Sequence, residues 1–237
     1  MSLDLIAFDG DDTLWHNERS FVEGRRRFRQ MLESAGVDLT NDEIEARVNL
    51  TDVRNIDVFG YGVSSFALSP IETAIELTDG RISGGELLTI VDHAKQMFTE
   101  SIELFPNVEQ VLAPLSEVYP LMLITKGDLL HQTSKLDRSG LRGYFRYVEV
   151  VSHKTARSYE EILSRHAVAP ERFLMVGNAL RSDVLPVVNA GGWAAHIPAA
   201  LSWSHEHADV PPHVHGRYFE LSAFEQVLEV IDRLARR

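Results

Sequence analysis

Three carboxylates crowd the stretch FDGDDTLW, residues 8–15. Asp9, Asp11 and Asp12 fall within four positions, directly after an apolar run. Ionised side chains at that spacing repel one another, so the cluster costs stability unless a cation or hydrogen-bond donors offset it. Two interpretations compete: a solvated acidic turn, where Asp is common, or a site that holds a cation and uses carboxylates in catalysis.

Further polar residues follow later apolar segments of the chain. They are Thr125, Lys126, Gly127 and Asp128 after the second segment, Lys154 after the third, and Gly177, Asn178 and Asp183 after the fourth. Carboxylate oxygens suit a hard divalent cation, whereas lysines and the backbone N–H groups of glycine-bearing turns suit a phosphate. Together these groups favour the catalytic interpretation of the acidic stretch.

The elements that must position these residues are expected to be buried parallel strands. Five short, almost wholly apolar segments read as strands: 3–8, 119–125, 144–152, 172–178 and 193–198. Helical patterns separate the last four, and a C-terminal amphipathic helix is expected from residue 224. Continuous apolar strands between helices indicate an α/β fold, a doubly wound, Rossmann-like parallel sheet. The carboxyl ends of its strands meet at one edge, where such sheets bind ligands.

Residues 18–104 show helical spacing throughout and predict a separate domain. Its expected helices cover 18–34, a segment that follows Thr40, 66–78 with Pro70 in its first turn, and 84–99. Thr40 and Glu43 form a capping-box pattern, and residues 60–65 (GYGVSS) are expected to be a loop. We therefore predict a catalytic core of residues 1–17 and 105–237, with a helical domain of residues 18–104 inserted in it.

Composition narrows the functional classes. The chain has 237 residues, a net charge of −12 and no cysteine. The charge disfavours nucleic acid and anionic membranes as partners, and the missing cysteines exclude thiolate chemistry. The N-terminus lacks the features of a secretory signal, and no segment reaches the roughly 20 apolar residues of a membrane span. We expect a cytoplasmic protein; the sequence does not indicate its oligomeric state.

Four stretches together resemble a known family. LIAFDGDDTLW, LMLITKGD, the HK pair at Lys154 and FLMVGNALRSDVLPVVNAGG resemble, in order and spacing, the four motifs of the haloacid dehalogenase-like (HAD) hydrolases. The helical insert resembles the cap domain that this family carries between its first and second motifs.

The resemblance implies a role for each matched residue. Asp9 would be the nucleophile that forms an aspartyl-phosphate, and Asp11 the general acid and base. Thr125 and the backbone N–H of Lys126 or Gly127 would hold phosphoryl oxygens, and Lys154 would offset negative charge. A Mg²⁺ ion would bind Asp9, the backbone carbonyl of Asp11 and Asp183, with Asn178 as a further oxygen donor.

Asp11 separates the chemistries of this family. An ester oxygen needs a proton in order to leave, whereas a halide does not, so an acid at this position favours a phosphatase over a dehalogenase. We expect a small phosphorylated metabolite as substrate, such as a sugar phosphate, phosphoglycolate or a nucleoside monophosphate. The alternatives are a dehalogenase and a catalytically idle binding protein.

Two residues depart from the family pattern. Asp12 stands where glycine is usual, and Asp tolerates left-handed backbone geometry better than most residues. Asn178 replaces an acid in the fourth motif. We expect its amide oxygen to keep Mg²⁺ binding but to weaken it, so that Asn178→Asp tightens binding.

Other candidates remain open. Residues 57–66 and the segment Trp15, His16 and Asn17 would either face the substrate or serve only as a turn and as packing. A histidine-rich stretch contains His196, His205, His207, His213 and His215; because it holds paired prolines and no regular period, we expect a surface loop rather than a metal site. For Arg25–Arg27 we expect a solvated helix face.

Overall fold

The computed structural model describes residues 2–201, 206 and 208–236. It divides into two compact units. The first contains Met1–Glu18, Ile102–Lys126 and Leu136–Arg237, and the second contains Arg19–Ser101 and Gly127–Lys135. Residues 127–135, which we expected in the core, therefore group with the helical unit.

The first unit is built on a parallel sheet with the strand order β3-β2-β1-β4-β5-β6. The strands are β1 (Leu5–Phe8), β2 (Leu121–Lys126), β3 (Tyr147–Val151), β4 (Phe173–Gly177), β5 (Trp193–His196) and β6 (Tyr218–Glu220). Every adjacent pair is parallel, and β1 lies at the centre with Ala7 opposite Met122 of β2 and Met175 of β4. The predicted α/β doubly wound sheet is confirmed, but β6, at the edge, was not predicted.

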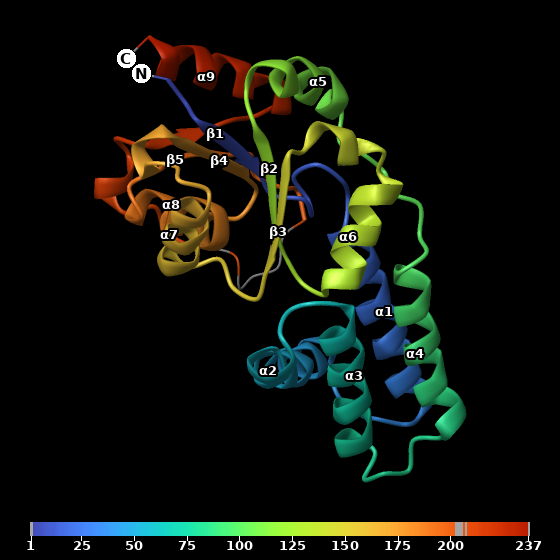
Figure 1. The fold of residues 1–237 in the computed structure, drawn as a ribbon. Coiled ribbons are helices and arrows are strands. Elements are labelled where there is room, and N and C mark those ends of the chain that lie inside the picture. The colour runs from blue at the N-terminus through green and yellow to red at the C-terminus, as the bar shows by residue number, and fades with distance from the viewer. Residues whose placement is uncertain (1, 202–205, 207, 237) are drawn as a thin grey trace. The chain divides into compact units, whose positions relative to one another are not determined.

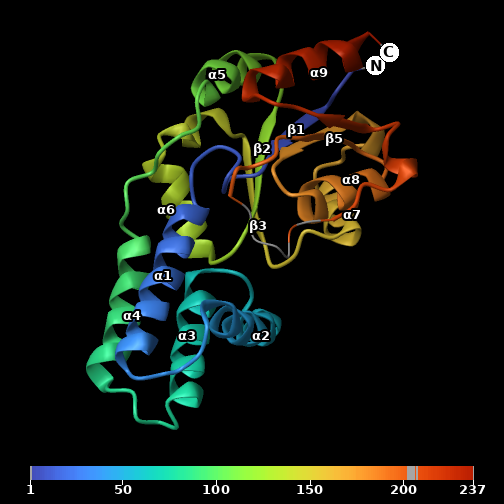
Figure 2. The same ribbon diagram turned by 180° about the vertical axis from the view of Figure 1, so that it is seen from behind.

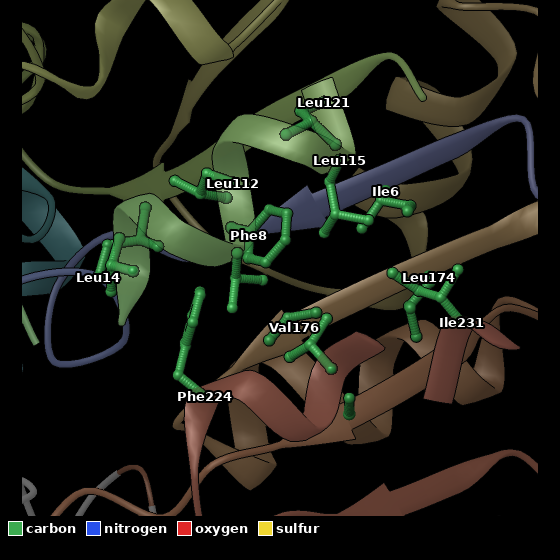
Figure 3. Close-up of a cluster of buried hydrophobic side chains, with 14 of the residues drawn as sticks. Ile6, Phe8, Leu14, Leu112, Leu115, Leu121, Leu174, Val176, Phe224 and Ile231 are labelled. Carbon is green, nitrogen blue, oxygen red and sulfur yellow. The ribbon is translucent and has the colours of Figure 1, made fainter. Parts of the chain in front are cut away.

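The two faces of the sheet carry different apolar layers. Ile6 and Phe8 of β1 point to one face, where they join side chains of α5 (Val108–Val118) and α9 (Val227–Ala235). Figure 3 shows Phe8 among side chains that include Leu112 of α5 and Val176 of β4. Leu5 and Ala7 belong to the opposite layer, with residues of α7 (Ala156–Arg165) and α8 (Leu185–Asn189). Successive side chains of each buried strand point to opposite faces of the sheet, so both faces are apolar. Helices cover both of them, as Figure 1 shows.

The second unit contains α1 (Glu18–Ser34), whose first residue belongs to the first unit, α2 (Asn41–Phe59), α3 (Val63–Leu77) and α4 (Gly84–Met97); Figure 2 gives a second view of these helices. Their apolar faces form small buried clusters, one of them around Phe28, Leu32 and Ile44. Thr40 and Glu43 form the predicted capping box at the start of α2. Helix α6 (Leu129–Arg138) begins in this unit and ends in the first.

Helix α3 differs from the prediction at its N-terminal end. It begins at Val63, directly after Gly62, so the expected loop over residues 60–65 shrinks to residues 60–62. Pro70 consequently lies inside the helix rather than in its first turn. The glycines of GYG suggested a longer loop, but Val63, Ser65 and Phe66 are buried, and this packing draws the helix start back to Val63.

Among the described residues, no helix is long and apolar enough to cross a membrane.

Candidate active site

A buried lysine joins two carboxylates at the carboxyl edge of the sheet. Lys154 Nζ lies 2.5 Å from Asp9 Oδ1 and 2.7 Å from Asp183 Oδ1. Asp9 directly follows β1, Lys154 follows β3, and Asp183 lies in a short π-helical turn, η3 (Leu180–Val184), after β4. The side chains of Lys154 and Asp183 are each 1% exposed. The parallel topology thus gathers three of the predicted site residues, which are far apart in sequence.

Burial controls the charges of this cluster. It raises the pKa of Asp9 to about 7, and the charges of Asp183 and Asp11 add to the rise, while Lys154 opposes it. Burial alone would lower the pKa of Lys154, but the charges of Asp183 and Asp9 outweigh it and raise that pKa. Lys154 is therefore held as an ammonium, and burial favours the protonated form of Asp9 more than exposure to water would.

The side chains of Thr13 and Asn178 add two further oxygen atoms to this cluster. The Thr13 hydroxyl lies 3.3 Å from Asp9 Oδ2 and 3.3 Å from Asn178 Oδ1. Because the hydroxyl has one hydrogen, it donates to only one of these oxygens at a time. Asp183 is fixed from its other side, since its Oδ2 accepts a hydrogen bond from the backbone N–H of Ala179 at 3.0 Å. Oxygen atoms of Asp9, Asn178 and Thr13 therefore converge at the end of β1.

Asp11 is held by the indole of Trp15, for which the sequence predicts only cleft lining or packing. Trp15 Nε1 donates to Asp11 Oδ1 at 2.7 Å, and the Trp15 side chain is fully buried. The ring lies so close to the loop backbone that a Cβ at Gly10 would come within 2.7 Å of it. Glycine at position 10 thus lets the indole reach under the loop and orient the carboxyl group.

Asp12 has a structural role in the same loop. Its φ of 57° lies in the left-handed region, which Asp tolerates. Its carboxylate accepts hydrogen bonds from the backbone N–H groups of Asn17 at 3.0 Å and Glu18 at 3.0 Å. Glu18 is the first residue of α1, so Asp12 joins the loop that follows β1 to the start of that helix.

Lys126 contacts two residues that the sequence did not mark. Its Nζ donates to Ser182 Oγ at 2.9 Å and forms an ion pair with Glu206. Ser182 Oγ in turn donates to Glu206 Oε2 at 2.5 Å. Thr125, at the end of β2, is buried, and Gly127 has a φ of 125°, which glycine adopts readily. Glu206 was not predicted as a site residue, because it lies in a long connection that has no motif and no regular period.

The haloacid dehalogenase-like hydrolases match this chain over residues 3–191, a span that includes Asp9, Lys154 and Asp183. The chain belongs to the haloacid dehalogenase-like hydrolases. The family resemblance and the expectation of a hydrolase are thereby confirmed.

Individual relatives agree with this membership. A glyceraldehyde 3-phosphate phosphatase from Methanothermobacter thermautotrophicus is 40% identical over 211 residues, which cover 84% of this chain and 88% of that protein. A second glyceraldehyde 3-phosphate phosphatase, from Methanopyrus kandleri, is 25% identical over 98% of both chains. The crystal structure of a haloacid dehalogenase-like family hydrolase from Xanthomonas campestris is 35% identical and superimposes with a TM-score of 0.86, covering 99% of this chain and 94% of that one.

The donor set of this hydrolase fits a divalent cation. Asp9, Asp11 and Asp183 bring three carboxylates to a region where Lys154 supplies one ammonium, so negative charge is in excess. Among the described residues, no group of three or more His, Asp or Glu side chains could hold a metal on its own. The remaining donors would have to be the oxygens that Mg²⁺ readily accepts: a backbone carbonyl, an amide oxygen and water. The Asp11 carbonyl and the Asn178 amide would supply the first two.

The other candidates of this hydrolase have defined contacts. His196 Nε2 lies 2.9 Å from the backbone carbonyl of Asn178, and its Nδ1 lies 3.2 Å from Tyr218 Oη. A ring nitrogen can only donate to that carbonyl, so His196 supports the loop that carries Asn178. His205 and His207 lie outside the described residues, as does the side chain of His213.

His16 and Asn17 belong to the entry into α1. The His16 ring packs on Phe105, with ring centroids 3.9 Å apart, and Asn17 donates its N–H to Asp12.

In the second unit, Ser64 belongs to the candidate stretch of residues 57–66. Its backbone N–H and its hydroxyl donate to the Asp128 carboxylate, both at 3.2 Å.

Two arginines of the basic run agree with the expected solvated face, and one does not. Arg26 and Arg27 are exposed and pair with Glu23. Arg25 is largely buried instead: its guanidinium lies 3.1 Å from Glu45 and 3.7 Å from Asp52. A buried carboxylate at position 52 gives this arginine an inward partner, which the sequence could not indicate.

Proposed function

We propose that this protein hydrolyses phosphate monoesters of a small metabolite, with Mg²⁺ as cofactor and an aspartyl-phosphate as intermediate. The observation that carries the proposal is the buried group in which Lys154 joins Asp9 and Asp183, with Asp11 held beside it by Trp15. A nucleophile, a neutralising cation and a second, separately oriented carboxyl group are what two-step phosphoryl transfer requires.

In the first step, an Asp9 carboxylate oxygen attacks phosphorus, and the bond from phosphorus to the ester oxygen breaks. Asp11 gives its proton to that departing oxygen, so the product leaves as an alcohol. In the second step, Asp11, now ionised, takes a proton from water while the water oxygen attacks the phosphorus of the aspartyl-phosphate. Inorganic phosphate and the Asp9 carboxylate are released, and Asp11 is protonated again.

The surrounding residues hold the phosphate and its charge. Lys154 offsets the repulsion between Asp9 and an incoming dianion. Thr125 and the backbone N–H of Lys126 or Gly127 are proposed to hold phosphoryl oxygens. Asp9, Asp183, the Asp11 carbonyl and Asn178 would bind Mg²⁺, which supplies further positive charge for the phosphoryl group.

For the substrate, we propose a three-carbon phosphorylated aldehyde such as glyceraldehyde 3-phosphate. The support is the 40% identity to a phosphatase of that name over most of both chains. A dehalogenase is less well supported, because halide departure needs no acid and gives Asp11 no task. The alternative of a catalytically idle binding protein is supported only by Asn178, which replaces an acid in the fourth motif.

The test measures phosphate release from p-nitrophenyl phosphate and from glyceraldehyde 3-phosphate in the presence of Mg²⁺. We expect turnover of both, loss of activity on addition of EDTA, and loss of at least about a thousandfold in Asp9→Asn, which removes the nucleophile. Asp232→Asn, an equal charge change on the exposed side of α9, serves as the control. Absence of turnover with any phosphate ester would instead favour a binding protein.

A further inference from the structure

Glu206 closes a triangle of polar contacts at the carboxyl edge of the sheet. Its two carboxylate oxygens accept from different donors: Oε1 from Lys126 Nζ and Oε2 from Ser182 Oγ. Lys126 also donates to Ser182 at 2.9 Å. The Lys126 and Glu206 side chains are only 16% and 17% exposed, so water screens the pair weakly. A carboxylate is therefore bound by a lysine and a serine from two different strand ends.

This triangle lies directly beside the catalytic group. Lys126 is the residue after Thr125, and Ser182 is the residue before Asp183. Burial would raise the pKa of Glu206, but Lys126 outweighs it, and the charge of Lys154 adds to the net lowering. Glu206 is thus an ionised carboxylate that already feels the charge of the lysine between Asp9 and Asp183.

We infer that Glu206 is a specificity-determining residue that disfavours phosphate esters carrying a carboxylate and thereby favours those with an uncharged aldehyde or hydroxyl at the far end. The inference rests on the proposed function, because it assumes that a phosphate ester binds at Asp9. In a three-carbon ester the far end lies only a few bonds from phosphorus, within reach of the groups that flank the phosphate.

The physical reason is that Lys126 and Ser182 already bind the carboxylate of Glu206. These two groups form a carboxylate-binding pair, as their contacts with Glu206 show. While Glu206 fills that pair, a substrate carboxylate meets a like charge at short range and finds the nearby cation occupied. A neutral aldehyde or hydroxyl meets no such repulsion. Glu206→Gln removes the negative charge at nearly constant shape, and with it the repulsion of a substrate carboxylate.

The experiment measures how strongly two competing esters inhibit p-nitrophenyl phosphate hydrolysis. The competitors are 3-phosphoglycerate, which carries a carboxylate, and glycerol 3-phosphate, which carries a hydroxymethyl group in its place. We expect Glu206→Gln to strengthen inhibition by 3-phosphoglycerate about tenfold or more relative to glycerol 3-phosphate. Glu206→Ala, which removes the carboxylate without adding an amide, should shift the ratio in the same direction.

An inhibition ratio within about twofold of wild type in both Glu206 variants would overturn the inference. Equal strengthening of inhibition by both esters is one such case, because it leaves the ratio unchanged and would mean that Glu206 acts on the phosphate group itself. Glu229→Gln, on the exposed side of α9, should leave the ratio unchanged. Failure of the wild-type protein to hydrolyse p-nitrophenyl phosphate would mean that the proposed function fails first.

Discussion

Asp12 shows how a charge that looks catalytic can serve the backbone. It adjoins Asp11 in the acidic stretch, yet its carboxylate accepts the N–H groups of Asn17 and Glu18. Two backbone donors at the entry of α1 thereby gain an acceptor, which is the stabilisation that capping residues provide. The left-handed φ at this position restricts the choice of residue further.

Substitutions at Asp12 should separate these two requirements. Asp12→Asn keeps an oxygen acceptor and a tolerance for positive φ, so its free energy of unfolding should stay within about 1 kcal/mol of wild type. Asp12→Gly loses only the acceptor, whereas Asp12→Ala loses the acceptor and adds backbone strain, for a total cost of about 2–3 kcal/mol. Urea unfolding of the three variants provides the measurement. Equal stabilities for the Asn and Ala variants would contradict this account.

Trp15 is expected to act on catalysis through Asp11. Its N–H donates to Asp11 Oδ1 at 2.7 Å, which fixes the orientation of the proposed acid. Trp15→Phe keeps an aromatic ring but removes the donor, so kcat should fall about tenfold or more, with a smaller change in KM. The pH profile of kcat should move as well, because the variant lacks the N–H group that donates to the Asp11 carboxylate. A loss of stability with an unmoved pH profile would indicate that Trp15 only packs.

At the scale of elements, apolar runs in the sequence predicted the buried strands well. They did not predict the partly polar strand at the edge of the sheet. The four strands from β1 to β4 are buried or half-buried and densely apolar, so composition alone marked them. Strand β6 has three residues at the sheet edge and ends in an exposed glutamate, which gave no such signal. The helical pattern between the fourth and fifth strand segments likewise gave no sign of the π-helical turn that carries Asp183, because the register of such a turn depends on packing rather than on periodicity.

The same contrast explains which site residues could be predicted from the sequence to lie close together. Asp9, Lys154 and Asp183 each follow a recognisable strand, and parallel topology brings strand ends together. Glu206 follows no such rule, since its contacts with Lys126 and Ser182 depend on the path of the connection between β5 and β6.

Asp52 of α2 should make the helical unit sensitive to pH. Burial raises its pKa from 3.8 to about 6, although Ser69 and Arg25 oppose the rise. The folded protein therefore binds more protons than the unfolded chain between these values, so stability falls as pH rises through this window. Asp52→Asn removes the buried charge, and Arg25 keeps Glu45 as a partner.

The variant should match wild type near pH 4 and be more stable above pH 6, by about 1–3 kcal/mol. Urea unfolding at pH 4.5 and 7.5 measures the difference at both ends of the window. A stability difference between variant and wild type that is the same at the two pH values would refute the assignment.

At the scale of the whole molecule, the net charge of −12 complicates any test of metal binding. Added salt of any kind screens repulsion within so acidic a chain, so a rise in Tm with MgCl₂ is not specific by itself. The comparison has to be made with NaCl at equal ionic strength. A site formed by Asp9, Asp183 and their neighbours should add a stabilisation beyond screening, because a ligand that binds only the folded state shifts unfolding by mass action.

We therefore expect Mg²⁺ to raise Tm above the NaCl control, with about 1.4 kcal/mol of stabilisation at ten times its dissociation constant. Asp183→Asn should abolish this excess, and Asp232→Asn on α9 should preserve it, although both remove one negative charge. Asn178→Asp should reach the same Tm shift at lower Mg²⁺ concentration, because it adds a charged oxygen donor next to Asp9 and Thr13. An excess that is equal in wild type and Asp183→Asn would place the metal elsewhere, since the carboxylate beside Lys154 would then contribute nothing to its binding.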